Sequence, residues 1–404
     1  MPIASNPVAM SDQHFDVIGL TDGREPFFPP EVMQVIASGK VFSGGTRHHQ
    51  IVAHLLPQDA EWIDITVPLD DVFARYEGIP HIVVFASGDP LFFGFGNTIR
   101  RRLPQASLRV FPAENSLQML AHRLLLDYHE MKCVSLTGRP WDALDEALIL
   151  GLPLIGALTD NVHTPAAAAG RMLEYGYDNY RMNVGVRLGN DALETLWSGT
   201  LKEAAEKQFD TPNCFIIEQT QPRPRPFGIS EGDFALLDGR VNMITKMPVR
   251  LLTLQMLDLR GRRCLWDVGF CTGSVSIEAR LQFPHLKVCA FEIREAGREL
   301  IEENSRRHGA PGIEVSIGDF LETDISTFPR PDAVFIGGHG GRLEEMLRRI
   351  DSVLLPGGVI VFNSVSAESL EMFIHAAEAV GRRISGRTHI ALDGHNPITI
   401  LRAE

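Results

Sequence analysis

The sequence predicts an α/β protein built from two domains, and three observations support this fold class. The chain has 404 residues, more than one ordinary hydrophobic core accommodates, so two domains of about 200 residues each are expected. Short apolar stretches alternate with helix-periodic stretches in both halves. A proline-rich segment interrupts the chain near its middle, which is typical of a domain boundary.

The proline-rich segment is EQTQPRPRPFGIS, residues 218–230. Its three alternating prolines (Pro222, Pro224, Pro226) remove backbone donors and favour an extended, stiff chain. The alternative is a loop inside a single domain. We expect an N-terminal domain of residues 1–218, a linker of residues 219–229 and a C-terminal domain of residues 230–404.

Each half carries a series of strand-like segments. In the N-terminal half these are FDVIGL, VFSG, WIDITV, HIVVFAS and LRVFPA, followed by helical stretches such as ENSLQMLAHRLLL. In the C-terminal half they are CLWDVGF, KVCAFEI, IEVSIGD, DAVFIGG and GVIVFNSV, separated by helix-periodic stretches. Near-continuous apolar strands that alternate with helices are typical of parallel sheets covered on both faces.

Composition excludes several classes of protein. The chain has 38 basic and 51 acidic residues, a formal charge of −13, which argues against a nucleic-acid partner. No signal peptide is recognisable, and the longest apolar run, Ala147 to Leu158, is too short to cross a bilayer. The five cysteines are scattered without a Cys-x-x-Cys pair, so no metal site is expected. We expect a soluble cytoplasmic protein without a membrane partner.

The segment WDVGFCTGSVSIEAR, residues 266–280, predicts a cofactor loop between a strand and a helix. Asp267 is expected to end the strand, and Gly269 and Gly273 flank a turn whose backbone can approach a ligand closely. Cys271 stands at the second glycine of the dinucleotide pattern G-x-G-x-x-G, where a pyrophosphate needs backbone clearance. A cofactor without phosphates is therefore favoured.

Acidic residues stand at the ends of the next two predicted strands. Glu292 can accept hydrogen bonds from both hydroxyls of a ribose, and Asp319 could meet an adenine amino group. Taken singly, Asp267 could be a helix-capping acid, Glu292 a solvated charge and Cys271 a small buried filler. Taken in order, the three motifs resemble the class I methyltransferases that use S-adenosylmethionine.

The segment after the fourth predicted strand reads IGGHGGRLEEML. Amine-methylating members of the class I methyltransferases carry an Asn/Asp-Pro-Pro-aromatic turn at this place. Here glycines and a helix N-terminus offer a pocket for carboxylates instead. We expect Gly338, Gly340 and Arg342 to bind an anionic substrate, although Arg342 could equally be a solvated surface residue.

Further segments make the resemblance specific. ITKMPVR (residues 244–250), DVGFCTGSVSIEA, IGGHGG and DGHNPITIL resemble the C-terminal domain of the precorrin-6Y C(5,15)-methyltransferases (decarboxylating), a family of corrin-biosynthesis enzymes. SGDPLFFGFG (residues 87–96) is similar to the S-G-D-P-x-F-Y-G signature of tetrapyrrole methylases, and PAENSLQMLAHRL, VSLTGRP and VGVRLGNDALETLWSGTLKE resemble their later segments. The match covers nearly the whole chain. The first G-x-G-P-G loop departs, because this chain reads Gly19-Leu20-Thr21-Asp22-Gly23.

The resemblance implies a two-lobed tetrapyrrole-methylase domain followed by a Rossmann-like class I methyltransferase domain, each binding its own S-adenosylmethionine. In the N-terminal half, the implied cofactor positions are Gly19, Leu20, Ser87, Gly88, Asp89 and Ser116. In the C-terminal half, they are Thr245, Gly269, Phe270, Cys271, Thr272, Gly273, Glu292, Asp319 and Phe320. For Asp89, a residue that only forms a turn is the alternative.

The implied reaction is methylation of meso carbons 5 and 15 of an anionic tetrapyrrole, with decarboxylation of the ring C acetate. The family assigns carbon 5 to the N-terminal domain, and carbon 15 with decarboxylation to the C-terminal domain. We hypothesise that His339 or His395 assists proton delivery during decarboxylation; hydrogen bonding to a substrate carboxylate is the alternative role.

The substrate carboxylates require cations. Candidates in the N-terminal half are Arg47, His48, His49, Arg139 and the run Arg100 to Arg102, for which a solvated face is favoured. A homo-oligomer is expected. The alternative functions are an RNA methyltransferase and a non-catalytic scaffold that binds S-adenosylmethionine.

Overall fold

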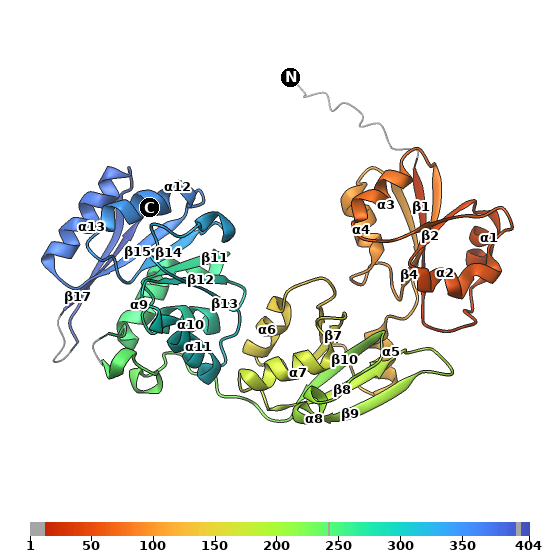
Figure 1. Ribbon diagram of the computed structural model, residues 1–404, viewed down its shortest axis with the longest axis horizontal. Helices are drawn as coiled ribbons and strands as arrows, with labels where there is room; N and C mark the ends of the chain where they lie inside the picture. The colour runs from red at the N-terminus through yellow and green to blue at the C-terminus, as the bar shows by residue number, and fades with distance from the viewer. Residues whose placement is uncertain (1–12, 241–242, 393–396) are drawn as a thin grey trace, which may run out of the picture. The chain divides into compact units, whose positions relative to one another are not determined.

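The computed structural model describes residues 13–240, 243–392 and 397–404. These residues form a mixed α/β protein with three sheets (Figure 1). The contacts between residues divide the chain into two compact units. The first unit contains the chain up to Arg139 together with residues 153–169 and 180–219. The second unit contains residues 140–152, residues 170–179 and the chain from Thr220 onward.

The first sheet belongs to the first unit, and all its neighbouring strands are parallel, in the order β3-β2-β4-β1-β5. Its strands are β1 (His14–Leu20), β2 (Val41–Gly44), β3 (Glu61–Asp64), β4 (His81–Ser87) and β5 (Ser107–Phe111). The five strands predicted from the apolar segments are confirmed.

Helices cover both faces of this first sheet (Figure 1). On one face lie α1 (Pro30–Ser38) and α2 (Thr46–Val52), and on the other lie α3 (Leu69–Tyr76) and α4 (Phe95–Arg102). The central strands β1 and β4 are therefore buried on both sides, which explains their continuous apolar sequence.

The second sheet, also in the first unit, has the order β6-β7-β10-β8-β9. Its strands are β6 (Lys132–Ser135), β7 (Leu154–Leu158), β8 (Tyr180–Val186), β9 (Thr195–Thr200) and β10 (Asn213–Gln219). Only β6 and β7 pair in parallel, so the expectation of a parallel sheet is wrong here. A short connection joins β8 to β9, and a connection of that length can link only antiparallel neighbours. Helix α5 (Ser116–Leu124) packs against β10, and α8 (Leu201–Ala205) follows β9.

The third sheet forms the centre of the second unit, in the order β13-β12-β11-β14-β15-β17-β16. Its strands are β11 (Cys264–Val268), β12 (Lys287–Glu292), β13 (Ile313–Ile317), β14 (Ala333–Ile336), β15 (Val359–Ser364), β16 (Ile384–Ile390) and β17 (Ile398–Ala403). The five predicted strands are parallel, and two antiparallel strands that the sequence analysis did not predict, β16 and β17, extend the edge.

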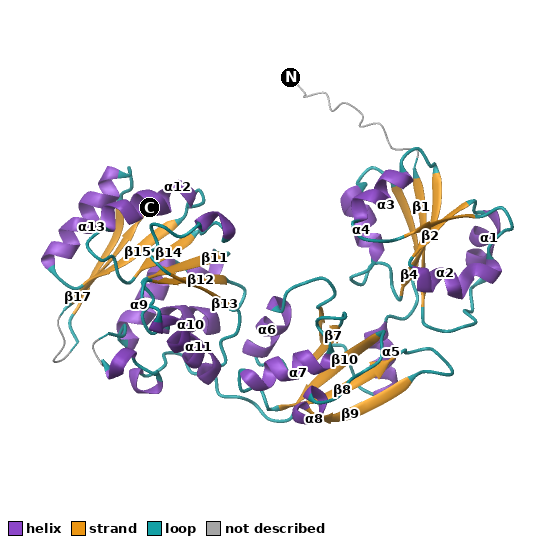
Figure 2. Ribbon diagram, viewed as in Figure 1, coloured by secondary structure: helices purple, strands orange, loops and turns teal. Residues whose placement is uncertain are grey.

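Helices also cover both faces of the third sheet (Figure 2). One face carries α9 (Met247–Leu257), α10 (Ser274–Gln282) and α11 (Ala296–His308), and the other carries α12 (Leu343–Val353) and α13 (Ala367–Ala379). The remaining helices are α6 (Asp142–Ile149) and α7 (Pro165–Glu174). No helix in the three described ranges is both long and apolar enough to span a membrane.

Candidate active sites

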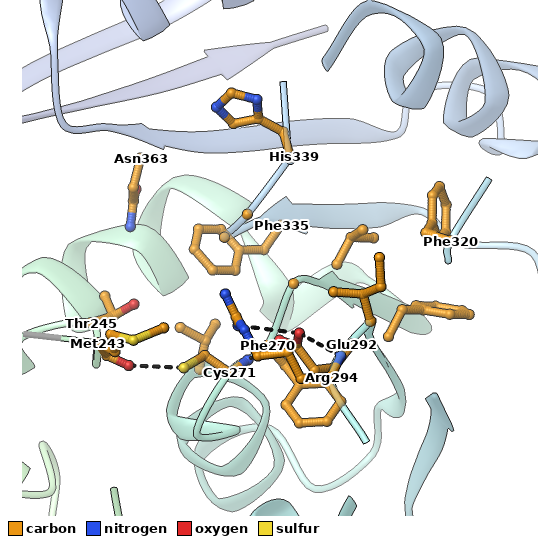
Figure 3. A pocket seen from close by; sticks show the side chains of 18 of the residues that line it. Met243, Thr245, Phe270, Cys271, Glu292, Arg294, Phe320, Phe335, His339 and Asn363 are labelled. Carbon is orange, nitrogen blue, oxygen red and sulfur yellow. Dashed lines mark hydrogen bonds and ion pairs between the residues drawn. The ribbon is translucent and has the colours of Figure 1, made fainter. Parts of the chain in front are cut away.

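A cavity of about 440 Å³ lies in the second unit, where the parallel strands of the third sheet end (Figure 3). The loops after β11, β12, β13, β14 and β15 all contribute to its lining, as expected for a site at the carboxyl edge of a parallel sheet. The predicted residues that line it are Thr245, Gly269, Phe270, Cys271, Thr272, Glu292, Asp319, Phe320, Gly338, His339, Gly340 and Arg342. Of the other two predicted residues, Gly273 forms the N-cap of α10, and His395 lies outside the described residues.

The backbone of the loop after β11 turns sharply and passes close to the loop after β14. Gly269 and Gly273 have φ angles of +79° and +74°, in the left-handed region that favours glycine. A Cβ atom on Gly269 would lie 2.6 Å from the backbone nitrogen of Gly338, so a side chain there would displace the neighbouring loop. The hydroxyl of Thr272 is buried and has no hydrogen-bond partner in the described chain.

Cys271 adopts the backbone conformation that a glycine would take, with a φ of +53°. Its thiol donates a 3.0 Å hydrogen bond to the carbonyl of Met243, as Figure 3 shows. Burial raises the pKa of this thiol, so it remains protonated and is not an activated nucleophile. The cysteine therefore fills the wall of the cavity without changing the course of the loop.

Asp267 caps a helix. Its Oδ2 accepts hydrogen bonds from the backbone N–H (3.1 Å) and the hydroxyl (2.6 Å) of Ser276, at the start of α10. The other oxygen, Oδ1, is buried without a partner in the described chain. Burial raises the pKa of Asp267 to about 7. The geometry thus favours the capping role, one of the two readings of Asp267 considered from the sequence.

Glu292 is the last residue of β12, and its carboxylate bonds to the loop after β11. Its Oε2 accepts a 2.9 Å hydrogen bond from the backbone N–H of Cys271, and its Oε1 accepts one of 3.1 Å from the backbone N–H of Arg294. The Arg294 guanidinium also lies 3.2 Å from Oε1 and lines the cavity. The side chain of Glu292 is only 2% exposed, so this carboxylate is held in a fixed orientation. The reading of Glu292 as a solvated charge does not agree with this burial.

Arg342 is paired with two carboxylates. It lies 3.1 Å from Asp319, at the end of the β13 loop, and 2.8 Å from Glu345 in the first turn of α12. Asp319 also accepts a 2.9 Å hydrogen bond from the backbone N–H of Leu321. About half of the Arg342 side chain is exposed, so its guanidinium faces the cavity rim while its charge is already compensated.

His339 and Asn363 lie on the side of the cavity away from Glu292 (Figure 3). The Nδ1 atom of His339 accepts a 3.2 Å hydrogen bond from the backbone N–H of Gly341, so the ring proton is assigned to Nε2. Burial lowers the pKa of His339, which favours the neutral ring. Asn363 was missed by the sequence analysis. It is the last but one residue of β15, and its amide donates a 3.0 Å hydrogen bond to the hydroxyl of Thr253.

A second cavity, of about 480 Å³, lies in the first unit. It is lined by the ends of β1 and β4, by the start of α5 and by residues of the second sheet. The predicted residues that line it are Leu20, Ser87, Gly88 and Ser116. The other two predicted residues, Gly19 and Asp89, do not line the cavity. A Cβ atom on Gly19 would lie 2.1 Å from the carbonyl oxygen of Gly88, and Asp89 accepts a 2.8 Å hydrogen bond from the N–H of Leu91. For Asp89 the geometry favours the turn-forming role.

Asp22, from the loop that departs from the family pattern, is buried beside the second cavity. Its carboxylate lies 2.6 Å from Arg47 and 3.0 Å from Arg187, and its Oδ2 accepts a 3.2 Å hydrogen bond from Asn190. Arg47 in turn reaches Ser87 at 2.9 Å. Asp22 therefore replaces the missing proline with a network that fixes two arginines, a role that the sequence did not indicate.

The cations proposed for the substrate carboxylates separate into two groups. Arg47, His48 and Arg139 line the second cavity. His49 instead stacks on Trp62 with ring centroids 4.2 Å apart, and the run Arg100 to Arg102 is exposed on α4. The structure thus favours the solvated-face reading for the triple arginine.

One cluster of potential metal ligands occurs among the described residues: His14, Asp16 and His81, at the amino ends of β1 and β4. Both oxygens of Asp16 already accept hydrogen bonds from Arg109, at 2.6 and 3.1 Å. A guanidinium thus neutralises the carboxylate, and the cluster lies at the edge of the sheet opposite the cavity.

Comparison with known proteins places the chain in a family. A family model described as a precorrin methyltransferase domain matches residues 238–400. A precorrin-6Y C(5,15)-methyltransferase (decarboxylating) from Sinorhizobium sp is 30% identical over 371 residues, which cover 91% of this chain and 88% of the relative. The chain belongs to the precorrin-6Y C(5,15)-methyltransferase (decarboxylating) family. Members of this family are S-adenosylmethionine-dependent C-methyltransferases, so the chain is such an enzyme rather than a scaffold.

Two further relatives of the precorrin-6Y methyltransferase family match parts of the chain. A cobalt-precorrin-6B C(15)-methyltransferase (decarboxylating) from Salmonella typhimurium is 40% identical over 138 residues, which cover 34% of this chain and 70% of that protein. A crystal structure of a precorrin-6y C5,15-methyltransferase from Geobacter metallireducens has 32% sequence identity and a TM-score of 0.41, covering 45% of this chain and 99% of its own.

Proposed function

We propose that the chain methylates meso carbons 5 and 15 of a precorrin-6Y-type tetrapyrrole and decarboxylates its ring C acetate. The observation that carries this proposal is the presence of two separate cavities, each at the carboxyl ends of its own parallel strands. Membership of the precorrin-6Y C(5,15)-methyltransferase family supports the same reaction. Two separate cavities allow each of the two methylation steps its own methyl donor.

The domains in this proposal are those expected from the sequence. A two-lobed methylase domain of residues 1–218 would methylate carbon 5. A Rossmann-like domain of residues 230–404 would methylate carbon 15 and remove the carboxyl group, with residues 219–229 as the linker. The order of the five parallel strands in the third sheet, with its central β11 and β14, supports the Rossmann-like reading.

The cavity of the second unit suits S-adenosylmethionine. Gly269 has no side chain, so the backbone of its turn is accessible to a ligand, and Glu292 presents a buried carboxylate at the end of β12. Oε1 of Glu292 already accepts two hydrogen bonds from Arg294, whereas Oε2 accepts one from Cys271 and has capacity for one more, as a ribose hydroxyl would require. The unpartnered hydroxyl of Thr272 in the same wall is accounted for if a ligand approaches it. The volume of about 440 Å³ lies within the range of small-molecule sites.

The rim of this cavity suits a flat, acidic macrocycle. Ile293 and Val365, on the loops after β12 and β15, are 65% and 66% exposed, although both are apolar. Arg294 and Arg342 stand at the same rim. We propose that the apolar pair contacts the face of the tetrapyrrole, while the arginines meet its carboxylate side chains. Exposed apolar residues beside cations are typical of a surface that binds such an amphipathic ligand.

Catalysis of methyl transfer rests on alignment. When bound, S-adenosylmethionine supplies an electrophilic methyl group. A meso carbon between two pyrrole rings is already enamine-like, so the protein needs no strong base to create the nucleophile. The contribution of Glu292 and the loop of residues 269–273 is then to hold the donor in line with that carbon in a cavity from which water is excluded.

Decarboxylation requires the acetate to lose carbon dioxide while the conjugated ring accepts the electron pair and a proton is delivered to the carbon. His339 is neutral and carries its ring proton on Nε2, and a neutral imidazole is a poor acid. We therefore propose that His339 hydrogen-bonds to a substrate carboxylate through Nε2–H, which is the alternative role considered from the sequence. Proton delivery by His395 remains a prediction.

The test uses the purified chain with S-adenosylmethionine and either the metal-free or the cobalt-loaded tetrapyrrole. Mass spectrometry should show the gain of two methyl groups, and released carbon dioxide should be measured separately. His339→Ala should slow the release of carbon dioxide more than the methylation of carbon 5. A product with one methyl group, or no product with either substrate, would contradict the proposal.

Three further expectations concern partners and location. The net charge of −13 supports an enzyme that does not bind nucleic acid, because phosphates repel an acidic surface. The homo-oligomer and the cytoplasmic location expected from the sequence remain predictions.

A further inference from the structure

Ser87, at the end of β4, receives two hydrogen bonds from one side of the second cavity. The guanidinium of Arg47 lies 2.9 Å from its Oγ, and Nε2 of His48 lies at the same distance. Both donors belong to α2, and Ser87 itself is exposed and lines the cavity. The direction of the serine proton depends on whether His48 donates or accepts in this contact.

The tautomer of His48 is fixed by a backbone group. Its Nδ1 accepts a 3.2 Å hydrogen bond from the N–H of Gly45, so Nδ1 carries no proton and Nε2 carries the proton of the neutral ring. Burial, followed by the nearby charge of Arg47, lowers the pKa of His48 to about 4. The ring is therefore neutral at physiological pH, and Nε2–H donates to Ser87.

A serine hydroxyl has two acceptor positions and one donor. Arg47 and His48 occupy both acceptor positions of Ser87, which leaves only its O–H for a ligand. We infer that Arg47 and His48 are positioning residues that turn the Ser87 hydroxyl into a dedicated hydrogen-bond donor facing the cavity, and that this donor binds a carboxylate. The inference deepens the proposed function, because it rests on the first unit binding a methyl donor and a polyacid.

Charge favours an anionic acceptor at this place. Asp22 lies between Arg47 and Arg187, so its one negative charge faces two positive ones. The Arg47 guanidinium, directly behind the Ser87 hydroxyl, strengthens that hydroxyl as a donor. A carboxylate gains most from such a donor, and two carboxylates are available in the reaction: that of the amino-acid part of the cofactor and those of the tetrapyrrole.

The experiment compares wild type with Ser87→Ala, Ser87→Thr and His48→Phe in the full chain. Two-site calorimetric titration is carried out with S-adenosylhomocysteine and with 5′-methylthioadenosine, which lacks the carboxylate. The KM of the tetrapyrrole for carbon 5 methylation is measured in parallel. Ser107→Ala is the matched control, because Ser107 also bonds a histidine, His14 at 2.7 Å, but at the opposite edge of the same sheet.

If the donor meets the cofactor, Ser87→Ala and His48→Phe should weaken S-adenosylhomocysteine at one site by roughly tenfold or more and leave methylthioadenosine unchanged. If it meets the substrate, both ligands should bind as in wild type while the KM for carbon 5 methylation rises roughly tenfold. Either result supports the inference, provided that Ser87→Thr, which keeps the hydroxyl, is affected less than Ser87→Ala in the same measurement.

Two outcomes overturn the inference. Ser87→Ala could match wild type in all three measurements, or His48→Phe could match wild type where Ser87→Ala does not. Circular dichroism and thermal unfolding of every variant report whether the first unit is folded, and carbon 15 methylation reports the same for the second unit. A wild-type chain that binds S-adenosylhomocysteine at one site or none would count against the proposed function itself. Failure of the proposed function can therefore be told apart from failure of the inference about Ser87.

Discussion

The backbone N–H of Cys271 donates a 2.9 Å hydrogen bond to Oε2 of Glu292, and this bond joins the loop after β11 to the end of β12. This bond therefore links the two segments that would hold the sugar and the sulfonium of a cofactor. Because the loop turns at Gly269 and Gly273 with positive φ angles, the N–H of Cys271 points to Glu292 and not to solvent. The carboxylate of Glu292 thus has a structural role beside the binding role that we propose for it.

Replacement of Glu292 should disable the cavity of the second unit alone. In Glu292→Gln, the amide presents one acceptor oxygen where the carboxylate presents two, so either the bond from Cys271 or the bonds from Arg294 are lost and the side chain no longer keeps its orientation. We expect the affinity of that cavity for S-adenosylmethionine to fall by roughly tenfold to a hundredfold. Carbon 5 methylation should be retained. Glu314→Gln, on the neighbouring strand β13 and exposed, is the control and should bind as wild type.

The thiol of Cys271 should be dispensable, but the residue at this position must be able to adopt a positive φ angle. Cys271→Gly should retain cofactor binding, and its free energy of unfolding should change by no more than about 1 kcal/mol, because glycine adopts the +53° φ angle without strain. Cys271→Val places a β-branched side chain in the same conformation and should cost about 1–2 kcal/mol. Chemical denaturation and calorimetric titration of both variants check this. Loss of methylation in Cys271→Gly would show that the thiol has a chemical role.

The buried Asp267 should make the stability of the second unit depend on pH. Burial raises its pKa from 3.8 to about 7 in the folded chain. The folded state then binds a proton that the unfolded state has released, so this contribution to stability is complete below pH 4 and is lost as the pH rises toward 7. The loss has a slope of up to about 1.4 kcal/mol per pH unit.

Asp267→Asn removes this titration and keeps an oxygen for Ser276. Urea unfolding at pH 5 and pH 8 should therefore show a smaller pH dependence in Asp267→Asn than in wild type. Asp258→Asn, whose side chain is 65% exposed, should keep the wild-type dependence. An identical pH dependence in wild type and Asp267→Asn would show that Asp267 does not titrate in this range.

Removal of Asp22 should disable the cavity of the first unit. In Asp22→Asn, Arg47 and Arg187 remain close to each other without a compensating charge, which should cost roughly 3 kcal/mol of stability. Carbon 5 methylation should be lost while carbon 15 methylation continues. Asp70→Asn breaks the exposed pair with Arg102 and should cost less than about 1 kcal/mol. Full carbon 5 activity in Asp22→Asn would show that this network does not support the site.

The sequence predicted the parallel strands and the cavity of the second unit well, because both follow from local patterns. Gly269, Glu292 and Asp319 each lie within two residues of the end of an apolar strand, and the carboxyl ends of parallel strands meet at one edge. Asn363 follows the same rule at the end of β15 and could have been found by extending it to a fifth strand. The edge strand β16 carries alternating exposure, a signal of half-buried strands that was available in residues 384–390.

Contacts between distant segments could not be predicted in this way. Arg342 was expected to be either free for a substrate or solvated, whereas it pairs with Asp319, 23 residues away in sequence. Asp22 and Arg187 are 165 residues apart, and no periodicity connects them. The antiparallel pairing of the second sheet also depends on how β8, β9 and β10 meet, because their apolar runs resemble those of parallel strands.

Equilibrium binding of S-adenosylmethionine to the purified chain tests the central claim most directly. The account predicts two sites per chain, of which Glu292→Gln weakens one and Asp22→Asn weakens the other. A single site in the wild-type chain, or two sites that both respond to the same substitution, would contradict it.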